Sequence, residues 1–495
     1  MSFINIKNVI DERGQLNFIQ ENQIPFNIKR IFYITKISGM RGGHSHYECE
    51  QILICLNGTC ELYHTDGNNE NRFYLSNNSK GFYTPVNNWV EINNFSDNCI
   101  ILVLCSHLFE EKDYCRDKDL FYKIMKTKEK NIVKFNDISK ENQQFKDEMI
   151  LSVKNIIERG DFTYGKETIE FEKKFSNYIG MNYCVSCSNG TSALILALQS
   201  LCLDENSEIL IQSNTYVSGV IAILKNNLKI KWVDINSKNL NIDVKSLEEN
   251  ITENTKGLLL VHMYGSCTDM DKIMEIKRKY NLFLVEDCAQ AHGSEWKNKK
   301  LGSFGDISCF SFYPTKNLGA IGEAGCILTN EKIIYERIEK LKNFGQGERY
   351  KYSIFGENYK SSNLVMSSLN IKLKKLDQLN DNRINASKIY KKHLNNKIKF
   401  LEYDTVNLKY NFHLFVVILE KRDDLIRFLK TKNIEVGIHY PFPVYKTEAY
   451  KNFPCKYDTS EIMSKKILSL PFYPKIDEKN ILYICEQINN FYKTI

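Results

Sequence analysis

A change in hydrophobic patterning near residue 148 is the feature that most constrains the fold of this chain. Up to about residue 110, short strand-like apolar runs are separated by turn sequences such as Asn57-Gly58 and Asp66-Gly67. Beyond residue 148, runs with helical spacing alternate with short apolar runs. A length of 495 residues is also more than one ordinary core needs. The sequence therefore predicts a multi-domain protein, with an all-β part followed by an α/β part.

Each regime predicts an architecture of its own. In the first part, closely spaced apolar runs indicate an antiparallel barrel or sandwich; they cover residues 30–35, 51–56, 60–64 and 100–104. In the second part, strand candidates alternate with helix candidates, which indicates a mostly parallel sheet with helices on its faces. The strand candidates are 208–211, 257–261, 282–285 and 309–312, and the helix candidates are 148–158, 191–201 and 270–280. We expect one domain at 1–130, a polar linker at 131–147, a large α/β domain at 148–380 and a small α+β subdomain at 381–495.

Composition excludes several classes of function. The 67 Lys and Arg face 60 Asp and Glu and form no basic cluster with interleaved aromatic residues, so no nucleic-acid partner is expected. Apolar stretches are too short to span a membrane, and the N-terminus has no apolar secretory core. The 15 cysteines lie mostly in apolar runs, as buried thiols in a reducing compartment do. We expect a cytoplasmic protein without a membrane partner.

Four features of the second part belong together. A Ser188-Asn-Gly-Thr-Ser192 turn opens a helix, where free N–H groups and hydroxyls suit a phosphate. Asp287 ends one strand candidate, Lys316 follows another, and Tyr216 follows a third. An amine, an acid, a phosphate cradle and a stacking ring are what pyridoxal 5'-phosphate (PLP) requires. The set therefore predicts a PLP site at the carboxyl edge of the sheet.

From about residue 136 onward, the chain resembles the sugar aminotransferases of the DegT/DnrJ/EryC1/StrS family, which have the fold-type-I PLP architecture. The resemblance rests on the segments 158–165, 188–191, 286–293, 302–306, 311–319, 439–441 and 468–474. It implies that Lys316 binds the cofactor covalently and later carries a proton. A dehydratase branch of the family has histidine at that position, so the lysine favours transamination, with L-glutamate as the usual amino donor.

The same resemblance assigns the other cofactor contacts. Asp287 pairs with the pyridine nitrogen and Gln290 contacts the ring hydroxyl. Tyr216 stacks on the ring of the cofactor. The phosphate is held by Gly190, Thr191 and Ser311. Asn358 reaches the phosphate in the neighbouring subunit, which implies a homodimer or a higher homo-oligomer. The chain departs from the family at Lys360–Val365, where the usual Arg, Asp, Glu and Gln are absent.

In the first part, His44-Ser-His46 is the candidate site. Residues two apart on a strand share a face, so both imidazoles would point the same way. The alternatives are surface histidines, a metal site and acid–base chemistry. Val90 occupies the position where a metal-binding cupin would offer a third histidine. Two histidines alone make a poor metal site, so we expect no bound metal. Histidine titrates near neutral pH, so acid–base work fits the pair.

Residues 1 to about 125 resemble the cupin-fold (RmlC-like jelly roll) sugar-nucleotide 3,4-ketoisomerases, which act on dTDP-4-keto-6-deoxyglucose. The matching segments are 41–46, 51–58, 94–96 and 110–121, with Tyr47 and Val90 as departures. By this resemblance His44 and His46 are the acid–base pair, and Tyr33 and Arg41 contact the substrate. Which histidine removes the C3 proton stays open.

The two chemistries are consecutive, because moving the ketone from C4 to C3 creates what a 3-aminotransferase consumes. We therefore expect a bifunctional enzyme that makes a dTDP-3-amino-3,6-dideoxyhexose, of galacto or gluco configuration at C4. Two alternatives stay open. One is a 4-aminotransferase whose cupin is a non-catalytic sensing or dimerisation module, and the other is a non-catalytic regulator with the PLP fold.

Overall fold

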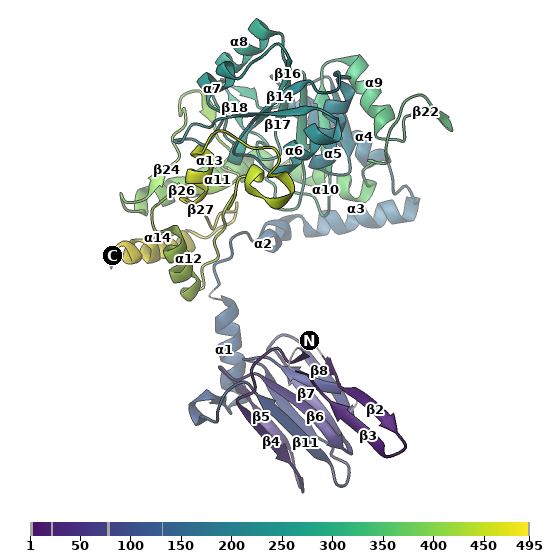
Figure 1. Ribbon diagram of the computed structural model, residues 1–495, viewed down its shortest axis with the longest axis vertical. Helices are drawn as coiled ribbons and strands as arrows, with labels where there is room; N and C mark the ends of the chain where they lie inside the picture. Colours follow the sequence, from purple (N-terminus) through teal and green to yellow (C-terminus); the bar gives the residue numbers. More distant parts are fainter. Residues whose placement is uncertain (1–2, 21–22, 77–79, 131, 494–495) are drawn as a thin grey trace. The chain divides into compact units, whose positions relative to one another are not determined.

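The computed structural model describes residues 3–20, 23–76, 80–130 and 132–493. The chain divides into two compact units, residues 1–132 and 133–495, which are followed by colour along the sequence in Figure 1. Among the described helices, none combines the length and the apolarity that crossing a membrane requires. Each unit has its own hydrophobic core.

The N-terminal unit is built from two five-stranded sheets in which every pairing is antiparallel. The first sheet has the order β1-β9-β6-β11-β4, with bounds Phe3–Asn5, Lys80–Thr84, Gln51–Asn57, Ile100–Cys105 and Arg30–Ile34. The second has the order β12-β5-β10-β7-β8, with bounds Tyr114–Cys115, Arg41–His46, Trp89–Asn93, Thr59–Thr65 and Glu70–Ser76. A separate hairpin joins β2 (Lys7–Asp11) to β3 (Gly14–Phe18), and it projects from the sheets in Figure 1. The β-rich cupin architecture expected from the sequence is thus present.

Alternating side chains explain how these sheets enclose a core. Phe32 and Ile34 of β4 pack on the interior cluster that contains Leu53, Leu62 and Ile101. A second apolar cluster, formed by Ile4, Ile52, Ile54 and Leu104 with partly buried neighbours, lies on the opposite face of the first sheet. Helix α1 (Lys118–Lys130) follows the short η2 turn (Glu111–Asp113) and contributes Phe121 to a third cluster.

The C-terminal unit is organised around a seven-stranded sheet with the order β13-β21-β20-β17-β16-β14-β15. The bounds in this order are Tyr183–Cys187, Gly325–Thr329, Ile307–Ser311, Phe283–Asp287, Thr255–Val261, Glu208–Gln212 and Lys229–Val233. Strands β20 to β15 run parallel, whereas β21 is antiparallel to both of its neighbours. The near-continuous burial of these strands agrees with a parallel sheet that is covered on both faces.

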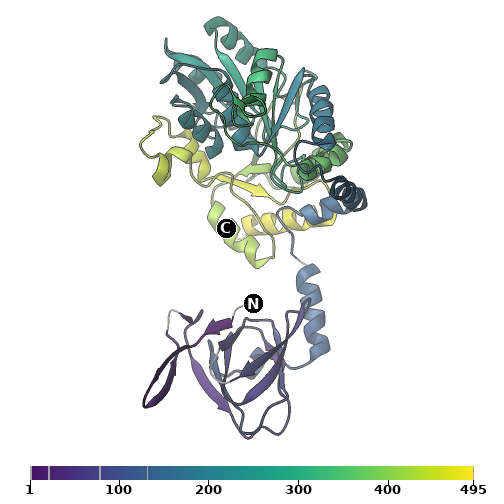
Figure 2. The ribbon, with the colours of Figure 1, turned by 90° about the vertical axis from the view of Figure 1, so that its right-hand side faces the viewer.

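Two layers of helices cover this sheet. Helices α5 (Gly190–Ser200), α6 (Val217–Lys225) and α9 (Lys332–Leu341) belong to the core on one face. Helices α4 (Lys166–Ile179), α7 (Val244–Glu249) and α8 (Met270–Tyr280) belong to the core on the other face. Figure 2 shows the unit from a second direction, with helices on both sides of the strands. This arrangement is the expected fold-type-I α/β layer structure.

The chain then completes a smaller subdomain. Its sheet has the order β24-β26-β27, with bounds Lys399–Phe400, Phe415–Ile418 and Ile467–Leu470. Two helices lead into the subdomain, α10 (Asn363–Leu373) and α11 (Leu376–His393). Its other helices are α12 (Arg422–Thr431), α13 (Thr459–Ser464) and α14 (Glu478–Lys493). The remaining short elements are β18 Glu295–Trp296, β19 Lys299–Lys300, β22 Gln346–Glu348, β23 Lys351–Tyr352, β25 Leu408–Lys409, η4 Met263–Gly265, η5 Val444–Lys446 and η6 Glu448–Tyr450.

The expectation of a linker at 131–147 was wrong for residues 133–147, which fold onto the C-terminal unit. Val133 exchanges backbone hydrogen bonds with the segment 433–435. Glu141, on α2 (Ile138–Asn142), forms a buried 2.8 Å ion pair with Lys372. Phe145, at the end of η3 (Gln143–Phe145) just before α3 (Lys146–Arg159), is buried in a small apolar cluster. The segment resembles a linker because it is mostly polar, but some of its charged side chains pair within the unit, as Glu141 does with Lys372 and Lys140 with Asp477.

Candidate active sites

The first candidate site is a cavity of about 820 Å³ in the C-terminal unit. It opens beyond the carboxyl ends of β14, β16, β17 and β20, where open α/β sheets bind their ligands. Seven of the eight cofactor-binding residues predicted from the sequence line it: Gly190, Thr191, Tyr216, Asp287, Gln290, Ser311 and Lys316. The fold thus brings together residues that lie up to 126 positions apart, from 190 to 316, in the chain.

The N-terminus of α5 forms the cradle at one end of the cavity. Asn189 caps the helix, since its side chain accepts a 2.9 Å hydrogen bond from the Ser192 N–H. The Thr191 hydroxyl lies 2.7 Å from that of Ser218. A Cβ on Gly190 would lie only 2.6 Å from the Cβ of Ser311, so this position requires glycine for the helix to approach β20. Free N–H groups and hydroxyls at a helix N-terminus are a ready site for a phosphate.

Asp287 and Lys316 face the same cavity from β17 and from the turn after β20. Burial raises the pKa of Asp287, and the Ala289 N–H and the Lys316 charge partly offset that effect. Burial also lowers the pKa of Lys316 to about 8, against a smaller opposing effect of Asp287. A much larger fraction of this amine than of an ordinary lysine is therefore neutral near physiological pH, and the neutral amine is what a nucleophilic lysine requires.

A buried ion pair supports the strand that carries Asp287. His262 Nε2 lies 2.9 Å from Glu286 Oε2, and the His262 backbone N–H donates to the Asp287 carbonyl. Glu286 also accepts from three backbone N–H groups between residues 302 and 305. Burial alone would raise the pKa of Glu286, but the hydrogen bonds from His262 and from this backbone keep it lowered. Sequence reasoning assigned no role to His262, although it follows a strand as Asp287 does.

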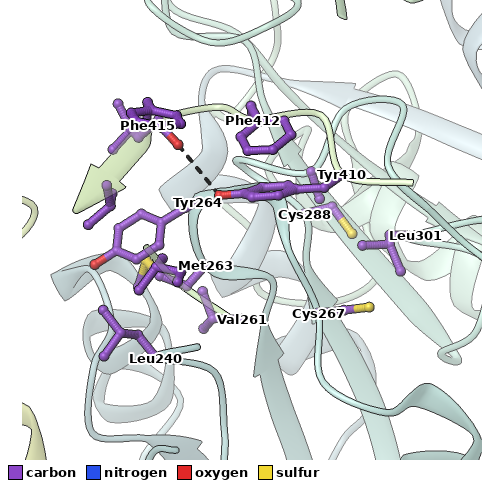
Figure 3. Close-up of a cluster of buried hydrophobic side chains, with 14 of the residues drawn as sticks. Leu240, Val261, Met263, Tyr264, Cys267, Cys288, Leu301, Tyr410, Phe412 and Phe415 are labelled. Atoms are coloured by element: carbon purple, nitrogen blue, oxygen red, sulfur yellow. Dashed lines mark hydrogen bonds between the residues drawn. The ribbon is translucent and has the colours of Figure 1, made fainter. Parts of the chain in front are cut away.

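Gln290 and two tyrosines form the other side of the cavity. Gln290 Oε1 accepts a 2.6 Å hydrogen bond from the Tyr264 N–H, and its Nε2 lies 3.3 Å from the Tyr440 hydroxyl. The Tyr216 and Tyr440 rings are 5.4 Å apart, and Tyr216 is 52% exposed. Tyr440 was quoted in a family motif but was not predicted as a site residue. Figure 3 shows how Met263 and Tyr264 are anchored among buried side chains, with Tyr410 and Phe412 close by.

Asn358 is the predicted cofactor residue that the fold does not bring to the cavity. It is exposed, and its backbone forms a bridge to Asn343, while its neighbours Glu357 and Tyr359 do line the cavity. The segment Lys360–Val365, which departs from the family pattern, contributes hydrogen bonds within the fold. The buried Asn363 side chain accepts from Thr168 and donates to Glu167.

These residues fit PLP. The cavity offers an amine on Lys316, a carboxylate on Asp287 and an exposed aromatic ring on Tyr216. The close approach of Gly190 to Ser311 leaves backbone N–H groups and a hydroxyl together at the end of α5. This donor set matches the cofactor's carbonyl carbon, its pyridine nitrogen, its ring face and its phosphate.

The second candidate site surrounds His44 and His46 on β5. Their ring centroids are 4.9 Å apart, and the Tyr114 ring packs on both, at 4.9 Å and 4.2 Å. His46 Nδ1 lies 2.7 Å from Asp113 Oδ2, and its Nε2 lies 3.0 Å from Gln51 Nε2. The two imidazoles therefore lie on the same face of β5, as the His-x-His spacing predicts.

The two histidines differ in their surroundings. Burial, followed by the charge of His46, lowers the pKa of His44 to about 4, and its Nδ1 has no hydrogen-bond partner among the described residues. His46 instead has both ring nitrogens engaged. Asp113 orients it, and Arg116 stacks on Tyr114 with its guanidinium 4.4 Å from the ring centroid. Sequence reasoning missed Asp113, Tyr114 and Arg116 as site residues, although they lie in the tail segment 110–121 that carries the resemblance.

Tyr33 and Arg41 do not join the histidines within this unit. Tyr33 is 70% exposed on the face of β4 opposite to Phe32 and Ile34, which pack on the core. Arg41 is exposed at the start of β5, separated from His44 by two glycines of positive φ. Both faces of β4 carry apolar residues, so alternation alone does not identify its inward face.

Comparison with known proteins agrees with this geometry. Residues 143–489 match the DegT/DnrJ/EryC1/StrS aminotransferase family, and residues 1–126 match the family described as WxcM-like, C-terminal. The chain is 35% identical over 361 residues to the dTDP-3-amino-3,6-dideoxy-α-D-galactopyranose transaminase of Aneurinibacillus thermoaerophilus, covering 73% of this chain and 99% of that protein. It is 33% identical to the GDP-perosamine synthase of Escherichia coli O157:H7, covering 65% and 89%.

Solved structures show the same fold in the C-terminal unit. The Streptomyces venezuelae DesV structure, in complex with a ketimine intermediate, superposes with a TM-score of 0.71 at 29% identity, covering 74% of this chain and 99% of DesV. The NtdA structure from Bacillus subtilis, with bound cofactor PMP, superposes with a TM-score of 0.68 at 26% identity, covering 73% and 86%. PMP is the amino form of PLP, in agreement with the cofactor derived from the cavity.

Proposed function

Since the chain belongs to the DegT/DnrJ/EryC1/StrS aminotransferase family of PLP-dependent enzymes, we propose that it makes a dTDP-3-amino-3,6-dideoxyhexose in two steps. The N-terminal unit converts dTDP-4-keto-6-deoxyglucose into its 3-keto isomer, and the C-terminal unit transaminates that ketone. One observation carries the proposal. A single chain holds both the pair of histidines supported by Asp113 and the cavity that contains Lys316 and Asp287. The 3-keto sugar made at the histidines is the substrate that the Lys316 cavity would transaminate.

The isomerisation needs one group to remove the C3 proton and one to protonate the C4 oxygen. The Asp113 carboxylate at Nδ1 of His46 favours the tautomer with the proton on Nδ1, which leaves the Nε2 lone pair as the base. Gln51 now occupies that Nε2 and would yield to the sugar. His44 relays the proton: its pKa is lowered to about 4, so it is neutral before the reaction and readily gives up a proton once it has received one. Loss of the C3 proton and protonation at O4 give the enediol, and loss of the O3 proton with protonation at C4 gives the 3-ketone.

In the C-terminal unit, bound PLP supplies the electron sink for the amino transfer. The chain's own residues do the rest. The cradle of Gly190, Thr191 and Ser311 binds the phosphate, and Asp287 holds the proton on the pyridine nitrogen. The Lys316 amine would attach the cofactor and, once released, would carry a proton to and from the sugar carbon that receives the amino group, which its lowered pKa of about 8 permits.

The remaining cavity residues position the reactants. Tyr216 lines the cavity beside Tyr440, and its partly exposed ring is available to stack on the ring of the cofactor. Gln290 is held by the Tyr264 N–H and directs its Nε2 into the cavity near the Tyr440 hydroxyl. The 3-amino product assigned here follows the name of the Aneurinibacillus relative, which matches over 99% of its length. L-Glutamate is the proposed amino donor.

The product decides between this function and its alternatives. We expect protein supplied with dTDP-4-keto-6-deoxyglucose, L-glutamate and PLP to form a sugar with nitrogen on C3, identified by proton and carbon NMR. A product with nitrogen on C4 would show a 4-aminotransferase with a non-catalytic cupin. Formation of 2-oxoglutarate would separately verify the donor, and an unchanged sugar in a PLP-loaded protein would favour a regulator.

A further inference from the structure

Three cysteine thiols meet in the core of the N-terminal unit. The sulfur atoms of Cys55, Cys60 and Cys99 all lie within 4.8 Å of one another, and the residues are 0%, 1% and 3% exposed. Cys55 and Cys60 lie on β6 and β7, on either side of one turn, and Cys99 joins them from the position just before β11. Within the described parts of the chain, this cluster is the one group of potential metal ligands made of thiols alone.

Two turns close over this Cys55–Cys60–Cys99 cluster. Gly58 connects β6 to β7 with a φ of +76°, and a Cβ there would lie 3.1 Å from the Cys99 Cα, so the backbone approaches the cluster closely. The Cys55 thiol donates to the carbonyls of Asn57 and Gly58, at 3.3 Å and 3.2 Å. The second turn is fastened where the Ser96 hydroxyl accepts from the Thr59 N–H at 2.8 Å. An ion from solvent would therefore reach the thiols only through local opening of these turns.

The surroundings of the cluster are apolar. Its neighbours in the same core are aliphatic and aromatic side chains, among them Leu62, Leu75, Phe95 and Ile101. The hydrogen bond from Cys60 lowers the pKa of Cys55 to about 7, whereas burial raises the pKa of Cys99 to about 11. These shifts come from the other thiols, from burial and from the backbone, with no charged side chain involved. A complex formed here would therefore have no counter-charge.

We propose that the Cys55–Cys60–Cys99 cluster binds one trivalent thiophilic ion, of the arsenic(III) type, through its three sulfur atoms. Arsenous acid and three thiols give a tris-thiolate complex and three water molecules. Three As–O and three S–H bonds break, three As–S and three O–H bonds form, and no atom changes oxidation state. The complex is neutral, whereas three thiolates leave a net negative charge around a divalent or monovalent ion. Since an uncompensated charge is costly in an apolar core, neutrality selects the trivalent ion.

The spacing of the sulfur atoms agrees with three-coordination. Thiolate bonds of about 2.3 Å, arranged as a trigonal pyramid around an ion with a lone pair, place three sulfurs about 3.5 Å apart. Sulfurs within 4.8 Å of one another reach that arrangement if each moves inward by less than about one ångström. Such a complex would join β6, β7 and the start of β11, and a bound ligand stabilises the folded state in proportion to its occupancy.

The test compares bound arsenic in full-length, PLP-loaded protein and its variants. The reduced proteins are incubated with sodium arsenite, desalted and analysed for arsenic per chain. We expect Cys60→Ser and Cys99→Ser to bind one arsenic fewer than the parent. Cys202→Ser, which changes an exposed cysteine of the other unit, serves as the matched control and keeps the full content. Circular dichroism identifies any variant that has lost its fold.

Mapping of the protected thiols in the parent protein tests the same proposal without any substitution. Folded parent protein, with and without arsenite, is alkylated for a time that suffices to modify the three thiols in the arsenite-free sample; it is then desalted, denatured and labelled with a second reagent, and the cysteines that escaped the first reagent are located by mass spectrometry. We expect Cys55, Cys60 and Cys99 to be protected together. Full alkylation of these three residues, or equal arsenic content in all the folded proteins, would overturn the proposal and would make the cluster ordinary core packing.

Discussion

At the scale of single residues, the amine of Lys316 determines how the enzyme takes up its cofactor. Capture of PLP requires the neutral amine, and burial lowers the pKa of this lysine to about 8 from an ordinary value of 10.5. We therefore predict that the rate of PLP capture by the cofactor-free protein rises about tenfold per pH unit below pH 8 and levels off above it. Stopped-flow absorbance measures the rate.

Asp287 provides the control for this pH profile. Its charge raises the pKa of Lys316, so Asp287→Asn should move the midpoint to lower pH. A midpoint near 10.5, or a shift to higher pH in the variant, would contradict the account. Lys316→Ala should leave no cofactor attached after borohydride treatment, and attachment to another residue would refute the assignment.

The histidine pair gives a second prediction at this scale. Asp113→Asn removes the carboxylate that fixes the His46 tautomer, while it leaves the side-chain volume nearly unchanged. We expect isomerisation to fall by about 10²–10⁴-fold, the usual contribution of a general acid–base group. Amino transfer to a 3-keto sugar supplied from outside should not change. An isomerisation rate equal to the parent's would show that Asp113 has no part in the chemistry.

At the scale of elements, the approach of α5 to β20 shapes the phosphate cradle. Gly190→Ala would place a Cβ 2.6 Å from that of Ser311, so the helix N-terminus must shift away from the strand. Such overpacking costs about 1–3 kcal/mol, equivalent to a roughly 5–150-fold change in an equilibrium constant. We predict that PLP affinity, measured by absorbance titration, weakens within this range.

A glycine with room for a methyl group is the matched control. In Gly347→Ala the nearest atom to the new Cβ is the Cε of Lys340, at 3.5 Å, so PLP affinity should not change. Equal affinities for both variants would mean that α5 does not hold the phosphate.

Sequence patterns predicted the elements where periodicity and capping agree. The helix over 270–280 has these bounds in the structure, because Asp269 caps its start and Asn281 ends it in the left-handed region. Strand β5 was harder, since Arg41–His46 contains two glycines and no large apolar residue. The antiparallel direction of β21 was not predictable, because buried strands look alike in either direction.

Local sequence patterns likewise predicted only part of the two candidate sites. Residues adjacent to a strand end, such as Asp287 and Lys316, follow from local pattern. Asp113 approaches His46 through tertiary folding, across 67 positions that carry no periodic signal, whereas Gln51 reaches it from the start of the next strand. Tyr33 was assigned from the family resemblance and not from a pattern in the chain; it is exposed on β4, and its contact with the substrate stays a prediction.

At the scale of the whole molecule, we predict a homodimer through the C-terminal unit. Asn358 is exposed beside the cavity-lining Glu357 and Tyr359, so its side chain is free to reach a second copy. Light scattering should give twice the chain mass of 57.8 kDa or a multiple of it. Asn358→Ala should weaken PLP binding without unfolding the protein, and a fully active monomer would rule out the shared site.

The two units have separate cores, so their activities should be separable by substitution. The most direct test follows the C3 proton of dTDP-4-keto-6-deoxyglucose by NMR in deuterated water. The account predicts that Lys316→Ala washes out this signal at the parent rate and makes no amino sugar. The His44→Asn/His46→Asn variant should lose washout by at least about 10²-fold and still transaminate a supplied 3-keto sugar. Washout at the parent rate in the double variant would contradict the account, because the cupin would then not be the isomerase.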